Sequence, residues 1–469
     1  MEPEKNPKRI MSVFTLVMIN VIAVDSLRSL PATAQFGYSV IFYYIIAGLF
    51  FLVPLSLVAG ELATAWPKTG GIYVWAKEAF GPVIAFTLVF LQWIYNVCWY
   101  PTILSLMAGT LAYCIDPSLA NNKMYMFFTI TGMFWAIVFI NCLGLRFSNY
   151  ISTATSIFGV ILPIGFIIFL GCYGFATGMP SQVHLTHTSW LPNINHLNSM
   201  VFFTSVLFTL VGIEMSAVHA QEVKNPQRDY PKAIFISSIL ILFSFIFASL
   251  AIASVVPTHQ LNVVTGLLDA YQLFFAEFHI AWLMPVVAIL IIFGGAGGVS
   301  AWVLGPVKAL LVASEDGLIP QSLSKLNRFQ APYRLIILQG LIFTLLSMAF
   351  IFMPSVSSSF WLLSDITSQL SFVFYIGLFL SAIVLRYKFP AKNRPFSVPF
   401  GNFGMWMACM SGIVLCILTI LVGFLPPEDL NIAWSSHYKY YLLAGIALFC
   451  LLPYIYGKRR LNIVHKQNK

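Results

Sequence analysis

The stretch AVDSLRSLP, residues 23–31, places Asp25 and Arg28 in the middle of an apolar segment long enough to cross a membrane. A second such segment, five further along the chain, carries VGIE, residues 211–214, which combines a glycine with the carboxylate of Glu214. An ionised side chain near the centre of a membrane-spanning helix costs roughly 2.5–3.5 kcal/mol on insertion scales, so it usually faces a cavity, a partner or a transport pathway. Interrupted helices in matching positions of two halves indicate the substrate site of a transporter.

The composition is that of an integral membrane protein. Of the 469 residues, 59% are hydrophobic and only 9% are charged, whereas soluble domains average about 25% charged residues. The first apolar run is too long for the apolar core of a signal peptide, so we expect it to remain as the first helix.

The hydropathy pattern predicts an all-α protein with about twelve transmembrane helices. Each apolar run is long enough for the ~20 residues that cross ~30 Å of hydrocarbon. The predicted spans are residues 10–36, 38–66, 82–115, 124–143, 151–175, 199–221, 231–256, 281–313, 335–353, 360–385, 405–425 and 440–456.

The basic residues define the expected orientation. With the N-terminus inside, all 25 Lys and Arg residues fall on predicted cytoplasmic segments except Lys123, Lys439 and the intramembrane Arg28. Cytoplasmic loops are enriched in Lys and Arg, so this separation supports the helix count and places both termini in the cytoplasm. The net charge of +9 therefore reflects topology and attraction to the lipid bilayer, and we expect no nucleic-acid binding.

The two interrupted segments also predict a repeat. If helices 6–10, residues 199–385, repeat the packing of helices 1–5, residues 10–175, the odd number of helices makes the second copy inverted in the membrane. The breaks in helices 1 and 6 would then meet at the midplane. Helices 11 and 12, residues 405–456, follow this core, and we treat residues 1–469 as a single transport domain.

Several motifs identify a family. The segment Gly212-Ile213-Glu214, followed by His219, Glu222 and NPQRDYP (225–231), resembles the helix 6 to 7 region of the bacterial glutamate/GABA antiporter family within the amino acid-polyamine-organocation superfamily. Further similar stretches are AGELAT (59–64), GGIYVW (70–75), AFGP (79–82) and AWVLGP (301–306). The resemblance covers nearly the whole chain. It implies a LeuT-like five-plus-five inverted repeat plus two helices, and transport of amino acids or amines, commonly by exchange and often with proton coupling.

Two departures from the family pattern concern the substrate. Superfamily members often carry a Gly-Ser-Gly type stretch at the helix 1 break, whereas this chain has Asp25-Ser26-Leu27-Arg28. The antiporters have a glutamate where this chain has Gly298. Glutamate is therefore not assumed to be the substrate.

The site is expected between the two breaks. The residues predicted to bind substrate are Asp25, Ser26, Arg28, Asn96, Val211, Gly212, Ile213, Gly298 and Trp302. Arg28 and the helix 1 backbone are expected to receive a carboxylate, because a guanidinium binds carboxylates in bidentate fashion. Asp25 and the backbone of residues 211–213 are expected to receive an amine, while Asn96, Gly298 and Trp302 would shape the side-chain pocket.

Structural alternatives remain for these residues. Asp25 and Arg28 lie three positions apart and can neutralise each other. Glu214, expected to gate the pathway or to couple protons together with Asp25, can instead bond freed backbone donors. The glycines of residues 294–298 form either a smooth wall or a packing surface. Asp365 lies near the predicted outer end of helix 10, where we expect it to be solvated.

The expected function is secondary active transport of amino acids by alternating access, most simply antiport, in the plasma membrane (inner membrane) of a bacterium. The alternative is a proton- or sodium-coupled symporter of amino acids or polyamines. Continuous polar stripes that would favour a channel are missing, as are the nucleotide-binding and hydrolase motifs GxxxxGK[ST], HExxH and GxSxG. We expect no enzymatic activity, catalytic residue, cofactor or metal site. The partners expected are an amino acid or amine substrate, protons as an option, and lipid; the oligomeric state is left open.

Overall fold

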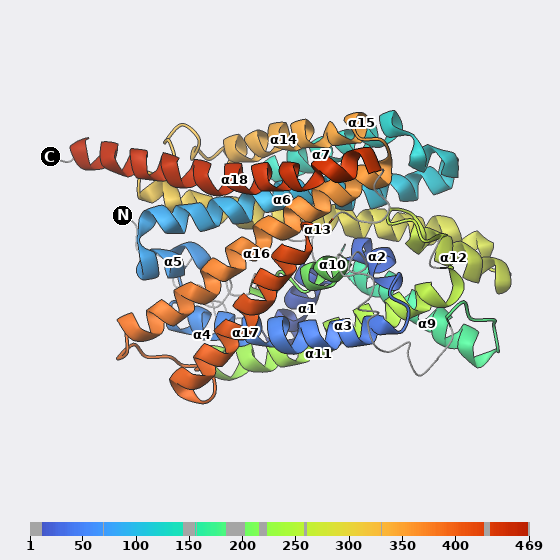
Figure 1. Ribbon diagram of the computed structural model, residues 1–469, viewed down its shortest axis with the longest axis horizontal. Helices are drawn as coiled ribbons and strands as arrows, with labels where there is room; N and C mark the ends of the chain where they lie inside the picture. The colour runs from blue at the N-terminus through green and yellow to red at the C-terminus, as the bar shows by residue number, and fades with distance from the viewer. Residues whose placement is uncertain are drawn as a thin grey trace.

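The computed structural model describes residues 12–68, 70–143, 155, 157–183, 202–214, 223–257, 260–329, 331–425 and 432–467. Every regular element in these ranges is helical (Figure 1). Ten helices are long and apolar enough to span a membrane, and they correspond to predicted helices 2–5 and 7–12. The predicted all-helical membrane fold is therefore confirmed. His219 and Glu222 lie outside the described residues, as does the end of predicted helix 6.

The first half of the chain contains predicted helices 1–5 and a short helix between helices 2 and 3. Its elements are α1 (Val13–Val24), η1 (Leu27–Ser29), α2 (Leu30–Ala34), α3 (Ser39–Ala47), η2 (Gly48–Leu52), α4 (Val53–Ala65), α5 (Ile72–Phe80), α6 (Pro82–Ile115), η3 (Pro117–Asn121), α7 (Lys123–Cys142), η4 (Ile157–Ile161) and α9 (Leu162–Ala176).

The second half contains predicted helices 6–12. Its elements are α10 (Phe202–Thr209), α11 (Pro226–Val255), α12 (Gly266–Glu277), η8 (Ala281–Leu283), α13 (Met284–Glu315), α14 (Tyr333–Ser347), α15 (Ala349–Phe352), α16 (Val356–Lys388), α17 (Gly401–Val422) and α18 (Ile432–Gln467). Helix α18 is longer at both ends than the predicted span 440–456, because polar and basic residues continue the helix beyond the apolar run.

Predicted helix 1 is interrupted where the sequence places its charges. Asp25 and Ser26 have extended backbone conformations, with ψ angles of 118° and 117°. The helix resumes through η1 and α2, where Pro31 stands in the first turn, a position that tolerates proline because its missing N–H would have no partner there. The break exposes backbone groups between α1 and α2.

Predicted helix 6 is interrupted at Gly212. Helix α10 ends at Thr209, and the chain turns through Gly212 with a φ angle of +117°. A Cβ atom at this position would lie 2.9 Å from the carbonyl oxygen of Ala23 and 2.9 Å from the ring of Trp302. Glycine is therefore needed both for the conformation and for the close approach of the two breaks.

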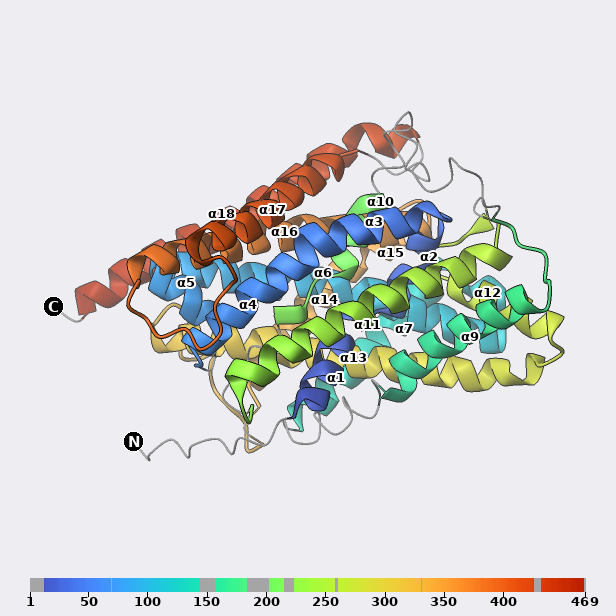
Figure 2. The same ribbon diagram turned by 90° about the horizontal axis from the view of Figure 1, so that it is seen from below.

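The long helices α6, α13 and α16 surround these breaks. Helix α6 packs against α13 and α16, while α1 packs against α11. Outside this core, α17 contacts α16 and α4, and α18 contacts α6 and α16. In Figure 2, α18 runs along one edge of the molecule and extends beyond the other helices toward the C-terminus.

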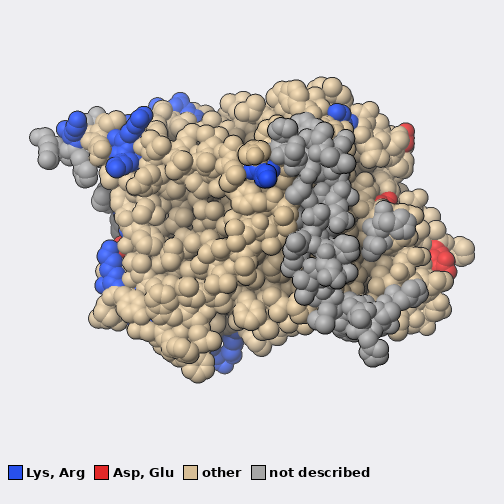
Figure 3. All heavy atoms as spheres, viewed as in Figure 1, with Lys and Arg blue, Asp and Glu red and all other residues tan. Residues whose placement is uncertain are grey.

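The surface has the character expected in a bilayer. Large apolar side chains such as Phe128, Ile289 and Leu345 are more than 60% exposed. In Figure 3, many of the visible Lys and Arg side chains gather at the end of the molecule near the C-terminus, and most of the visible Asp and Glu side chains lie toward the opposite end. The end near the C-terminus is therefore the more basic one on this face.

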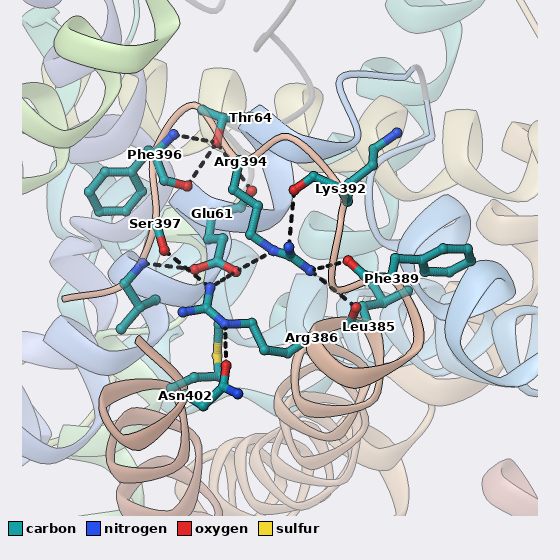
Figure 4. A network of polar contacts seen from close by, with 12 residues as sticks. Glu61, Thr64, Leu385, Arg386, Phe389, Lys392, Arg394, Phe396, Ser397 and Asn402 are labelled. Atoms are coloured by element: carbon teal, nitrogen blue, oxygen red, sulfur yellow. Dashed lines mark hydrogen bonds and ion pairs between the residues drawn. The ribbon is translucent and has the colours of Figure 1, made fainter. Parts of the chain in front are cut away.

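A buried charge cluster surrounds Glu61 (Figure 4). Glu61 of α4 accepts a hydrogen bond from Arg386 of α16, pairs with Arg394 Nε at 3.0 Å and accepts a bond from the N–H of Val398 at 2.8 Å. Arg394 also donates to the carbonyl oxygens of Leu385 and Phe389, at 3.2 and 2.9 Å, and so caps the C-terminus of α16. The cluster joins α4 to α16 and to the loop that follows α16.

Candidate substrate site

A narrow cavity lies between the breaks of helices 1 and 6. It encloses about 60 Å³, which is room for a few water molecules. Helices α6 and α13 complete its walls. The lining residues are Ala23, Val24, Asp25, Ser26, Leu27, Arg28, Ser29, Tyr95, Asn96, Trp99, Ile103, Leu106, Val160, Phe208, Thr209, Val211, Ile291, Gly294, Gly295, Gly298 and Trp302.

Asp25 carries a buried carboxylate at the helix 1 break. Its side chain is 7% exposed, and both carboxylate oxygens accept from the hydroxyl of Ser244 in α11, at 2.9 and 3.0 Å. No described Lys or Arg forms an ion pair with it. A buried carboxylate without a cation requires either a proton or a cationic ligand, so Asp25 is suited to receive an amine.

Arg28 contacts α16, which is predicted helix 10, and forms no ion pair with Asp25. Its Nη1 donates to the hydroxyl of Ser364 at 3.0 Å and its Nη2 to that of Ser29 at 3.3 Å. The guanidinium carbon lies 5.5 and 5.4 Å from the ring centres of Phe208 and Phe360. The alternative in which Asp25 and Arg28 neutralise each other is therefore not realised.

Arg28 and Ser26 retain unused hydrogen-bonding capacity. Arg28 is 4% exposed, and its Nε has no hydrogen-bond partner; the buried hydroxyl of Ser26 has none either. Buried polar groups are normally paired, and an exception calls for an explanation such as an absent ligand. Because both residues line the cavity, these donors can serve a carboxylate placed there.

The helix 6 break contributes its backbone and one carboxylate. Val211 lines the cavity, whereas Gly212, Ile213 and Glu214 lie behind its wall. Glu214 is fully buried and accepts a hydrogen bond of 2.8 Å from the hydroxyl of Tyr375 in α16. This bond links the break of predicted helix 6 directly to α16.

The glycines of α13 divide between packing and the cavity. A Cβ atom at Gly294 would collide with the backbone of Gly159, at 2.2 Å, and one at Gly297 would collide with Thr155, at 1.5 Å. A Cβ atom at Gly298 would meet nothing within 4 Å. Both interpretations of the glycine stretch are therefore realised, with Gly298 facing open space.

Helix 3 supplies an aromatic and polar wall. Asn96 lines the cavity, and its side-chain amide donates to the carbonyl of Gln92 at 2.7 Å. Trp99 and Trp302 meet edge to face, with ring centres 6.3 Å apart. The tryptophan pair forms one end of the cavity.

Several residues that the structure brings to this region were missed by sequence reasoning. Trp99, Phe208, Thr209, Ser244, Ser364 and Tyr375 occur in apolar runs where their spacing is no different from that of packing residues. The prediction for Asp365 is wrong. Its side chain is 2% exposed, because α18 (predicted helix 12) covers this part of α16 (predicted helix 10). The Asp365 carboxylate accepts a hydrogen bond from Tyr438 of α18.

Comparisons with known proteins agree with this architecture. A family model for amino acid permeases matches residues 11–449. An uncharacterized transporter of Legionella pneumophila is 47% identical over 452 residues, which cover 96% of this chain and 97% of the relative.

Two further relatives are named as antiporters. The glutamate/gamma-aminobutyrate antiporter of Lactococcus lactis is 28% identical, with 96% of this chain and 90% of the relative covered. A probable agmatine/putrescine antiporter of the same species is 24% identical, with 98% and 97% covered. The relatives are transporters, so the predictions of a multi-pass membrane transporter and of no enzymatic role are confirmed. The chain belongs to the amino acid permease family.

Proposed function

We propose that the protein exchanges amino acids or amines across the membrane by alternating access, with the substrate bound between the breaks of helices 1 and 6. The observation that carries this proposal is the cavity at which Asp25 and the unpartnered donors of Arg28 and Ser26 meet. A carboxylate and a guanidinium that do not neutralise each other suit a ligand with separate amine and carboxylate groups. The names of the two antiporters that the chain resembles support exchange.

Each predicted site residue has a role in this proposal. Arg28, Ser26 and the helix 1 backbone bind the carboxylate. Asp25 binds the amine together with the backbone of Val211, while Gly212 and Ile213, which lie behind the wall, shape the break that presents Val211. Asn96, Gly298 and Trp302 bound the space for the substrate side chain, and the open position at Gly298 sets its size.

The cavity volume and the hydrogen bond between α16 and Glu214 support alternating access. A cavity of about 60 Å³ is smaller than the ~300 Å³ typical of ligand pockets, so helices must separate to admit a substrate. The hydrogen bond between Tyr375 and Glu214 joins α16 to the break of predicted helix 6. We assign Glu214 to gating, with Glu214 and Asp25 as the candidate proton-coupling groups.

We further propose that the protein lies in the plasma membrane, the inner membrane of a bacterium, with both termini in the cytoplasm. The support is the distribution of Lys and Arg, which cluster near the C-terminal end of α18 (Figure 3). Accessibility of single cysteines introduced in the η3 loop and near residue 460 to an impermeant thiol reagent, in a variant without native cysteines, tests this orientation.

Reconstitution into liposomes tests the transport proposal. Uptake of labelled γ-aminobutyrate, glutamate, agmatine, putrescine and neutral amino acids is measured with and without unlabelled substrate inside, and with an imposed pH or sodium gradient. Uptake that needs internal substrate supports exchange. Gradient-driven uptake into empty vesicles supports the symport alternative, while rapid non-saturating flux would indicate a passive pore and contradict both.

A further inference from the structure

The cavity extends beyond the two breaks, between the facing helices α6 and α13. Trp99 and Trp302 meet at one end of the shared stretch, with ring centres 6.3 Å apart. At the other end, a Cβ atom at Gly295 would lie 2.7 Å from the side chain of Met107. Met107 follows Trp99 by eight residues and Gly295 precedes Trp302 by seven, so the two helices run in opposite directions and face each other over roughly 10–12 Å.

This part of the cavity has an apolar wall. Trp99, Ile103 and Leu106 follow one another at intervals of four and three residues, which places them on one face of α6. The polar residues of α6 that line the cavity, Tyr95 and Asn96, come about one turn before Trp99, at the end away from Leu106. The cavity-lining residues that we call the apolar wall are Ile103, Leu106, Val160, Ile291, Gly294 and Gly298. Its four side chains larger than glycine are at most 8% exposed.

The helices behind the apolar wall carry no charge at this depth. Helix α6 contains no Asp, Glu, Lys or Arg, and neither do η4 and α9. In α13 the first such residue is Lys308, six positions beyond Trp302. Among the described residues, Asp25 and Arg28 are the charged side chains that line the cavity, whereas Glu214 and Asp365 do not line it.

We propose that the substrates are α-amino acids with uncharged, apolar side chains, and that the apolar wall receives this side chain. The inference rests on the proposed function, in which Asp25 receives the amine and Arg28 the carboxylate. Those two roles use both charged side chains that line the cavity in the described part of the chain. A third charge on the substrate would therefore have no counter-ion to contact.

The physical basis of this selectivity is desolvation. An ionised carboxylate or ammonium group that leaves water for an apolar surface is strongly destabilised unless it meets a group of opposite charge. An apolar side chain gains free energy from the same transfer, because its surface is removed from water. The apolar wall thus favours the side chain of leucine and disfavours those of glutamate and lysine.

Self-exchange in liposomes tests the substrate class. Liposomes containing the full-length protein are loaded with one unlabelled amino acid, and uptake of its labelled form is measured for L-leucine, L-norleucine, L-glutamine, L-glutamate and L-lysine. Norleucine has the lysine side chain without its ammonium group, and glutamine has the shape of glutamate without its charge. We expect leucine and norleucine to exchange with a kcat/KM at least about a hundredfold above that of glutamate or lysine, with glutamine in between.

Gly298 allows a charge to be added to the apolar wall. A Cβ atom at this position would meet nothing within 4 Å, so Gly298→Asp can place a carboxylate in the cavity. Gly298→Asn is the matched control, because it adds the same shape without the charge. Gly298→Asp should exchange lysine at least about tenfold more efficiently than Gly298→Asn does, and both should exchange leucine less well than the wild-type protein. Melting temperatures of the two variants establish that they are folded.

The outcomes separate this inference from the proposed function. Wild-type exchange of glutamate or lysine as efficient as that of leucine would overturn the inference and leave the proposed exchange intact. Equal lysine exchange by the two folded Gly298 variants would also overturn it, because the substrate side chain would then lie elsewhere. If none of the five amino acids is exchanged, the inference is wrong, and the wider liposome panel decides the proposed function.

Discussion

The guanidinium of Arg28 lies near two phenylalanine rings, and its Nη1 and Nη2 donate hydrogen bonds to serines. Its Nε therefore remains available to a ligand. We predict that Arg28→Lys weakens binding of carboxylate substrates by about tenfold to a hundredfold, since hydrogen bonds to charged groups contribute roughly 1.5–3 kcal/mol and lysine cannot reproduce the planar fork. Putrescine binding should change little. Equal losses for both probes in a binding titration would contradict the assigned role.

The open space beside Gly298 gives a second prediction at this scale. A Cβ atom there would meet nothing within 4 Å, and Gly298 lines the cavity, so a leucine can extend into it. We predict that Gly298→Leu folds with a nearly unchanged melting temperature but loses more than nine-tenths of its exchange activity, an order-of-magnitude expectation from filling a narrow site. The matched control is Gly294→Leu, which collides with Gly159 and should lower the melting temperature sharply. Substrate exchange that survives in a folded Gly298→Leu protein would place the substrate elsewhere.

Among the secondary-structure elements, the helix 6 break depends on one glycine. We predict that Gly212→Ala destabilises the protein by roughly 1–3 kcal/mol, the cost of a strained backbone position, and also separates the two breaks, because the added methyl group would meet Ala23 and Trp302. Gly81 is the control: it too has a positive φ, +93°, but open space around it. Gly81→Ala should therefore lower the melting temperature without the additional loss of exchange.

The breaks were predictable from the sequence, whereas their partners were not. The charge at Asp25 is visible inside an apolar run because hydrocarbon makes a charge costly, and Gly212 is noticeable because the charged Glu214 follows it. The hydrogen bond from Arg28 to Ser364 joins positions 336 residues apart. The sequence around a serine in an apolar helix does not indicate which distant residue it will contact. The exposure of Asp365 was predicted wrongly because the residue lies near the predicted end of its helix, which suggested contact with solvent. Its burial under α18 depends on tertiary packing alone.

Across the whole molecule, the Glu61 cluster is the most concentrated set of buried charge contacts in the described residues (Figure 4). We predict that Glu61→Gln lowers the free energy of unfolding by about 3–5 kcal/mol, because it leaves Arg386 and Arg394 without their counter-charge. Thermal unfolding in detergent measures this loss. A control is Lys77→Met, which removes an exposed ion pair with Asp316 and should cost under about 1 kcal/mol.

Acid pH should stabilise the molecule through Asp269 of α12, which lies outside the candidate spans. Burial raises the pKa of this carboxyl above its ordinary value of 3.8, although hydrogen bonds from Tyr113 and Thr265 act in the opposite direction. The folded state therefore binds a proton more readily than the unfolded state, and stability falls as pH rises above 3.8 through the folded pKa. We predict that Asp269→Asn flattens this slope in melting temperatures measured between pH 4.5 and 7.

Asp116 is the control for that measurement. Hydrogen bonds from Ser118 lower the pKa of its exposed carboxyl below 3.8, so it is ionised in both states throughout the same range. Asp116→Asn should leave the slope unchanged. A slope that persists in Asp269→Asn would assign it to another group.

Helix α16 holds its three polar contacts in register. Ser364 meets Arg28, Tyr375 meets Glu214 and Arg386 meets Glu61. The three residues of α16 follow one another at intervals of eleven positions, which is close to three full turns, so they share one side of the helix about 16 Å apart. One side of α16 thus forms polar contacts with predicted helix 1 (at η1), predicted helix 6 (after α10) and predicted helix 2 (α4), at successive depths of the membrane. If these three helices move as a unit during transport, all three contacts break in one step, and the activation barrier includes the combined cost of breaking them.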